Sequence, residues 1–179
     1  DPKGVSELLP RDVRHPTWQV RMYVARAATV TKDSLLLTTM ALDPVGSVRE
    51  VAIQGLSATL GHLPDLVFVK ALSSKDYHVV LAAARALRGS KARDSVVAGA
   101  LDALDRISRE RRQTSRDPRL ELLARVRELG DSTSIARLQP LMSDEDEAVA
   151  LEAVSVMNHL HGPKGNGYTA APKQPTTQL

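Results

Sequence analysis

The sequence contains no cysteine and very few aromatic residues. Without cysteine, the chain cannot form disulfide bonds, use a catalytic thiolate or build a cysteine-based zinc site. Aromatic residues make up 3% of the chain, so a core must be built from aliphatic side chains and alanine. No apolar run approaches the ~18 residues that a membrane-spanning helix needs, and the amino end, DPKGVSELLP, lacks the apolar core of a signal peptide. We therefore expect no membrane association.

The remaining composition is that of an ordinary folded domain. The chain has 179 residues, of which 42% are hydrophobic and 25% are charged, as is typical of globular proteins. A net charge of +3 is too small to indicate a nucleic-acid partner unless the basic residues cluster. Because the sequence opens on Asp1 instead of methionine, we expect one region of a larger protein, which leaves its localisation open. We expect this region to be a monomer.

One pattern recurs along the chain at intervals of about 30 residues. Each copy begins with a turn, continues with a valine and places a small or apolar residue four positions later, which is the spacing of one helix face. The copies are Val20 with Val24, Val48 with Ala52, Val79 with Ala83, and Val149 with Ala153. The long interval before the last copy has room for one more unit around residues 120–129. The pattern therefore predicts five units.

Each unit also contains a second apolar segment, so the repeating element is a helical hairpin. These second segments span residues 33–42, 63–72, 92–107 and 132–142. Helix starts are indicated by proline, which occurs as Pro16, Pro44 and Pro118. Ser47 and Glu50 have the spacing of a capping box. Helix ends in the left-handed conformation are predicted at Gly61, Gly89, Gly130 and Gly162.

The hairpins predict an all-α fold, since no segment shows the alternation of a β-strand. One hairpin cannot bury its own apolar face, whereas stacked hairpins share a continuous core. We therefore expect residues 1–162 to form a stack of about five hairpins and residues 163–179 to form a flexible tail, because prolines, glycines and threonines dominate there. A single irregular helical bundle is the alternative.

The repeat is most complete in Asp43, Val48, Arg49, Ala52 and Leu56. These residues, with the partial copies that begin at Val20, Val79 and Val149, resemble the HEAT-like repeats of α-solenoid and armadillo-like proteins. The resemblance covers roughly residues 5–162 and implies a right-handed α-solenoid. In that family an aspartate and an arginine commonly form a polar ladder between repeats.

The ladder is incomplete in this sequence. His15 replaces the aspartate in the first unit, and Val80 and Ala150 replace the arginine in two later units. We interpret Arg21 and Arg49 as residues that connect neighbouring units, in preference to residues that bind a ligand.

The sequence contains none of the common catalytic or cofactor-binding motifs. A glycine-rich phosphate loop, an HExxH zinc motif and a nucleophile elbow are all missing. The five histidines are scattered, and no cysteine or neighbouring carboxylate completes a metal site near His159 and His161. We therefore expect no enzymatic activity, cofactor or metal in this chain.

Residues 105–119 contain six arginines but three acidic residues. One interpretation is that they cover the solvated face of a helix and the adjoining loop. The other is a basic lip that binds an acidic partner or phosphate. The candidate residues of this basic lip are Arg106, Arg109, Arg111, Arg112 and Arg116. We do not expect nucleic acid, because few aromatic side chains are present for base stacking.

Two further features have structural and functional interpretations. Residues 144–147 are all acidic, which suits the amino end of a helix, so we expect them to cap one. Trp18, the single tryptophan, falls in the first turn of the first complete unit. It either covers the exposed end of the stack or anchors a partner.

A second resemblance concerns the larger protein. The segments HPTWQVR and QTSRDPRLELL and the proline-rich exit after residue 162 are similar to the HEAT-repeat region of large bacterial proteins that carry a cyclophilin-type peptidyl-prolyl isomerase domain. This implies that any isomerase site lies outside the chain. Our first hypothesis is a non-catalytic scaffold that binds a protein or peptide. The alternatives are a substrate-binding accessory domain of such an isomerase, and phosphate or nucleic-acid binding through the basic lip.

Overall fold

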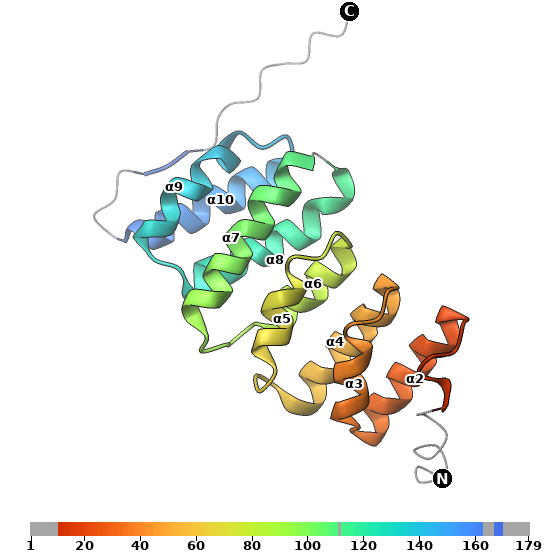
Figure 1. The fold of residues 1–179 in the computed structure, drawn as a ribbon. Coiled ribbons are helices and arrows are strands. Elements are labelled where there is room, and N and C mark those ends of the chain that lie inside the picture. Colours follow the sequence, from red (N-terminus) through yellow and green to blue (C-terminus); the bar gives the residue numbers. More distant parts are fainter. Residues whose placement is uncertain (1–10, 111, 163–166, 170–179) are drawn as a thin grey trace, which may run out of the picture.

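The computed structural model describes residues 11–110, 112–162 and 167–169. The described residues form helices and no strand (Figure 1), which confirms the all-α prediction. The helices are α2 (Trp18–Thr31), α3 (Ser34–Met40), α4 (Gly46–Leu60), α5 (Asp65–Ala71), α6 (Tyr77–Ala86), α7 (Arg93–Glu110), η1 (Gln113–Ser115), α8 (Arg116–Leu129), η2 (Ser132–Ser134), α9 (Ile135–Leu138), η3 (Gln139–Ser143) and α10 (Glu147–His161). Arg111 and most of the predicted tail lie outside the described residues.

The helices are arranged in two layers (Figure 1). In the first layer, α2, α4, α6, α8 and α10 follow one another in chain order, and each packs against the next. In the second layer, α3, α5 and α7 each pack against the first-layer helix that follows them in the chain, and α9 with η3 packs against α10 in the same way. All four predicted second segments are therefore helical. In the fifth unit, the described residues contain α10 without a second helix.

The first layer contains many small buried side chains. Ala25, Ala28, Ala52, Ala83 and Ala153 are completely inaccessible to solvent. Short side chains allow neighbouring helices to approach closely. Leucine, isoleucine and methionine supply most of the larger buried side chains, as expected from the scarcity of aromatic residues.

The same turn opens four of the five units. In each case a side chain accepts a hydrogen bond from the backbone N–H two residues later, which closes the turn before the helix starts. The pairs are His15 Nδ1 with Thr17 N (3.1 Å), Asp43 Oδ1 with Val45 N (2.8 Å), Ser74 Oγ with Asp76 N (3.1 Å) and Asp144 Oδ1 with Asp146 N (2.8 Å). The first position thus requires a hydrogen-bond acceptor, and His15 and Ser74 satisfy this requirement without a carboxylate.

A buried ion pair connects the first two units. Arg21 Nε and Nη2 donate to the two carboxylate oxygens of Asp43 at 2.7 and 2.9 Å, and Arg21 Nη1 donates to the carbonyl of His15 at 2.7 Å. Burial raises the pKa of Asp43, but the hydrogen bonds from Arg21 and from the N–H of Val45, with the charges of Arg21 and Arg49, lower it below its usual value. The interpretation of Arg21 as a connecting residue is confirmed.

Two more arginines reach the opening turn of the next unit. Arg49 donates to Ser74 Oγ at 3.4 Å and to the carbonyl of Asp43 at 2.7 Å, so the interpretation of Arg49 is also confirmed. Arg119 of α8 donates to Asp144 at 2.5 Å, a contact that the sequence analysis missed. At the junction between α6 and α8, Val80 stands in place of the arginine, so the series is interrupted there.

Two local predictions were wrong. Helix α4 begins at Gly46, after Val45, so Ser47 lies inside the first turn; no side-chain hydrogen bond among the described residues caps this helix. Gly130 has a φ of −72°, so it does not adopt the left-handed conformation. It is instead at a close approach, because an added Cβ would lie 2.5 Å from the carbonyl oxygen of Val126. Left-handed φ values were correctly predicted for Gly61, Gly89 and Gly162.

We predict that Asp43→Asn lowers stability at neutral pH and weakens the dependence of stability on acid. The folded pKa of Asp43 lies below its unfolded value of about 3.9, so the carboxylate stabilises the native state above that pH. This contribution is lost as the pH falls through the folded pKa. Urea denaturation across the acidic range should show the native chain losing stability more steeply than the variant. Parallel curves would contradict this prediction.

Removal of Arg119 should destabilise the junction between α8 and α10. Arg119→Leu leaves Asp144 without its ion-pair partner, and both side chains are at least nine-tenths buried. We expect the free energy of unfolding to fall by about 3–5 kcal/mol. Arg127→Leu, on the same helix, is the control: its side chain is 44% exposed, and its loss should cost less than about 1 kcal/mol. Equal effects in thermal or urea denaturation would show that the Arg119 contact is no stronger than a surface pair.

Candidate functional site

A groove of 1180 Å³ lies where the carboxyl end of α7 meets η1, the first turn of α8, η3 and the start of α10. Charged side chains of both signs line it: Arg109, Arg112, Arg116, Arg119 and Arg137, with Asp105, Asp117, Asp144, Glu145, Asp146 and Glu147. The groove thus brings Arg109, Arg112 and Arg116 of the basic lip together with the acidic run at residues 144–147. Along the sequence these two clusters are about 25 residues apart, so their proximity is a result of the fold.

Ion pairs between the helices join several of these opposite charges. They are Arg116 with Asp146 (2.6 Å), Arg119 with Asp144 (2.5 Å) and Arg137 with Asp105. Burial raises the pKa of Asp146, but Arg116 and the backbone N–H groups of α10 lower it more, so its pKa is below the usual value. Asp146 also accepts a hydrogen bond from Ala148 N at 3.0 Å. Its predicted role as a cap is confirmed, and its ion pair with α8 is an additional role.

Arg106 lies across the boundary between two units, outside the groove lining. Its Nη2 donates to the carbonyl of Leu72 at 2.9 Å, and its Nη1 lies 3.8 Å from the carboxylate of Glu110. Glu110 also accepts a hydrogen bond from the hydroxyl of Tyr77. Burial and the hydrogen bond to Glu110 raise the pKa of Tyr77. Arg106 is therefore engaged in contacts that hold α7 against the preceding unit.

Arg109 and Arg112 are the members of the basic lip that remain available to a partner. Both are exposed and line the groove. Arg112 is 3.8 Å from Glu110, and Arg109 forms no ion pair with another described residue. Their surroundings are not basic, however, because the acidic side chains of the groove lining slightly outnumber its arginines. A groove with balanced charge is not the continuous positive surface with which proteins bind a polyanion.

Trp18 lies far along the stack from the groove. It is the first residue of α2, at the opposite end of the first layer from α10 (Figure 1), and 37% of it is exposed. The structure therefore does not combine Trp18 and the arginines into one site. Both interpretations of Trp18 remain predictions.

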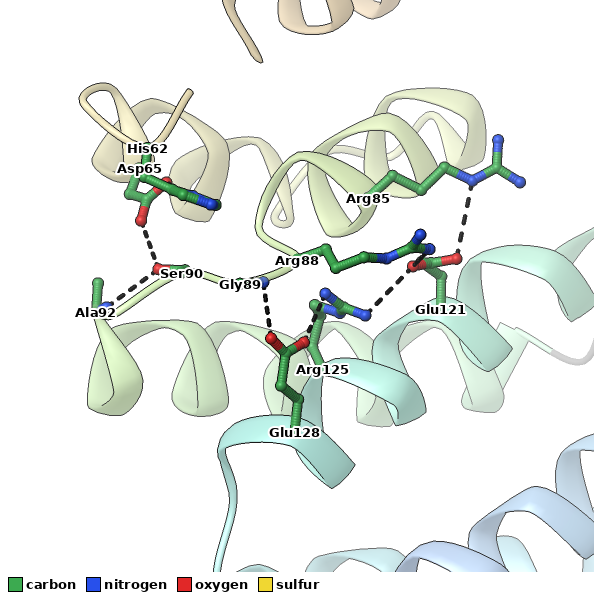
Figure 2. A network of polar contacts seen from close by, with 10 residues as sticks. All are labelled: His62, Asp65, Arg85, Arg88, Gly89, Ser90, Ala92, Glu121, Arg125 and Glu128. Carbon is green, nitrogen blue, oxygen red and sulfur yellow. Dashed lines mark hydrogen bonds and ion pairs between the residues drawn. The ribbon is translucent and has the colours of Figure 1, made fainter. Parts of the chain in front are cut away.

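Ser90, Asp65 and His62 form a hydrogen-bonded cluster between the loops that precede α5 and α7 (Figure 2). The hydroxyl of Ser90 donates to one carboxylate oxygen of Asp65, and His62 Nδ1 lies 3.1 Å from the other. Ser90 Oγ also accepts from Ala92 N at 3.1 Å. An activated serine needs its base in contact with the hydroxyl, whereas the imidazole here contacts the carboxylate. We therefore interpret the cluster as a structural clamp: its hydrogen bonds hold the turn before α7 in place.

A larger charged network joins α6 to α8, at the junction where Val80 interrupts the arginine series (Figure 2). Glu121 is 3.0 Å from Arg88 and 3.6 Å from Arg125, while Glu128 is 2.7 Å from Arg125 and accepts a hydrogen bond from Gly89 N at 2.7 Å. Burial lowers the pKa of Arg125, and the two glutamates partly offset this effect. The spacing of Glu121, Arg125 and Glu128 along one helix face was visible in the sequence, but their contacts with α6 were not.

The described residues offer neither a metal site nor a membrane span. No group of three or more histidine, cysteine, aspartate or glutamate side chains there could hold a metal ion. Among the same residues, no helix combines the length and the apolar character needed to cross a membrane.

We predict that Ser90→Ala lowers the free energy of unfolding by about 1–3 kcal/mol, because it removes a hydrogen bond from the buried Asp65. The variant should keep the native helix content, and the loss should appear in urea denaturation measured by circular dichroism. Lys75→Ala, at an exposed position, is a control for general effects of substitution. A fluorophosphonate reagent that labelled Ser90 in the native chain would contradict the interpretation as a clamp.

Comparisons of the chain with family models, with curated proteins and with solved structures gave no match. The HEAT-like and cyclophilin-related resemblances therefore stay predictions.

Proposed function

We propose that this chain is a non-catalytic protein-interaction scaffold, a short HEAT-like α-solenoid that holds a polypeptide partner in the groove between α7, α8 and α10. The proposal rests mainly on this groove, which has a volume of 1180 Å³ and a lining of both charge signs. A groove of this size accommodates several residues of an extended segment. The two layers of helices support the solenoid interpretation, because each unit covers the apolar face of the next.

The charge pattern favours a polypeptide over a polyanion. Arg116, Arg119 and Arg137 are already held by aspartates, so they fix the walls of the groove and contribute little net charge. Arg109 and Arg112 are left to pair with acidic side chains of a partner. Paired charges of this kind contribute mainly to specificity and to the rate of association. In a larger protein with an isomerase domain, the same groove would hold the client polypeptide.

The test is to select binding peptides from a random display library against the full chain and to measure their affinities for charge variants. Arg109→Glu combined with Arg112→Glu should weaken binding about tenfold or more, equivalent to at least about 1.4 kcal/mol. The control is Lys70→Glu combined with Lys91→Glu, which makes the same change in net charge at exposed positions outside the groove lining.

A fluorescent single-stranded oligonucleotide and inorganic phosphate are the competing ligands. Oligonucleotide binding that falls steeply with salt, and that the arginine variant abolishes, would replace the scaffold proposal with the nucleic-acid alternative. Peptide affinities that are equal in the two double variants would show that the groove is not the binding surface.

A further inference from the structure

Residues 167–169 lie against α10 and are held there through their backbone. The side-chain amide of Asn158 forms two hydrogen bonds with Tyr168: its Oδ1 accepts from Tyr168 N at 2.8 Å, and its Nδ2 donates to Tyr168 O at 3.2 Å. An extended residue presents its N–H and C=O on the same side, which is how neighbouring β-strands exchange pairs of hydrogen bonds. Asn158 therefore contacts this segment as an adjacent strand would.

The side chain of Tyr168 provides a second contact. It is partly buried and packs against the hydrophobic core. Its ring centroid lies 6.0 Å from that of His161, with the two planes tilted by 53°, a favourable geometry for neighbouring rings. Gly167 and Thr169, on either side, are exposed. Recognition therefore depends on one extended backbone unit and one aromatic side chain.

We propose that the surface of α10 around Asn158 and His161 is a docking site for an extended polypeptide segment with an aromatic residue, and that the chain's own residues 167–169 are its intramolecular occupant. The contacts with Asn158 use groups that every residue except proline offers, so they do not restrict the site to this sequence. The aromatic side chain supplies the specificity. This site is at the carboxyl half of α10, whereas the groove proposed above meets its amino end, so the two proposals are independent.

Attachment to the same chain explains why the site is filled. Tyr168 follows Asn158 by ten residues, and a short connection gives the tethered segment an effective concentration in the millimolar range. A free peptide with the same contacts would be excluded until the tethered tyrosine leaves. The site therefore behaves as a latch that a stronger aromatic segment can displace.

The test uses the full chain and a synthetic peptide with the sequence GNGYTAA, copied from residues 165–171. In Tyr168→Ala, the tethered occupant loses its aromatic side chain, so nuclear magnetic resonance titration should show binding of the free peptide at millimolar concentration. The native chain should bind it at least about twofold more weakly, because its own segment competes at an effective concentration similar to the Kd of the peptide. Asn158→Ala added to Tyr168→Ala should abolish binding, as should replacement of the peptide's tyrosine by alanine.

Hydrogen exchange supplies a second readout that does not need the free peptide. The amide of Tyr168 should exchange faster in Asn158→Ala than in the native chain, while His159→Ala, at the adjacent exposed position, should leave it unchanged.

Three results would overturn the proposal: no binding of the peptide to Tyr168→Ala, equal binding to the native chain and this variant, or a native chain that dimerises in sedimentation experiments through exchange of the segment. Arg109→Glu with Arg112→Glu, added to Tyr168→Ala, should leave peptide binding unchanged. This separates failure of the latch from failure of the groove.

Discussion

The stacking of this chain depends on the turn that opens four of its five units, and on the arginine that reaches three of these turns from the preceding unit. Asp43 shows how the two are linked. One of its oxygens accepts from Val45 N to close the turn, and both accept from Arg21 of the preceding helix. The same carboxylate thus determines where α4 begins and how far it lies from α2. Because the pair is buried, a unit shifted along its neighbour would leave a charge without a partner, which is costly.

The series of connecting arginines is interrupted at Val80, where a different set of charged residues joins the two units. Without an arginine at that position, α6 and α8 are connected by two sets of contacts: Glu121 pairs with Arg88 and Arg125, and Glu128 pairs with Arg125 and accepts from Gly89 N. Arg125 is almost completely buried, and its Nε has no hydrogen-bond partner among the described residues. An under-paired buried guanidinium costs free energy. This network therefore contributes orientation between the units more than stability.

The sequence predicted the helices well because the signals for them are local. Valine and alanine spacing, prolines and acceptor side chains all act within a few residues, and they located the five first-layer helices. Contacts between units, in contrast, join residues that are far apart in the sequence. Arg119 and Asp144 meet only because α8 and α10 pack in a particular register, which no short segment encodes. The basic lip and the acidic run could thus be identified from the sequence, but their pairing could not. The capping box predicted at Ser47 was wrong, because α4 already begins at Gly46.

The ion pairs between the basic lip and the acidic run determine which arginines can bind a partner. Read along the chain, residues 105–119 are a basic cluster, and the natural ligand for such a cluster is an anion. In the fold, Arg116 and Arg119 form ion pairs with Asp146 and Asp144, which precede α10. Arg106 contacts the preceding unit. The arginines that remain for a partner are those that the stack does not need for its own connections. Arginine thus serves both to connect neighbouring units and to bind a partner. An arginine that reaches a neighbouring unit connects the units, and one that does not is left for the partner.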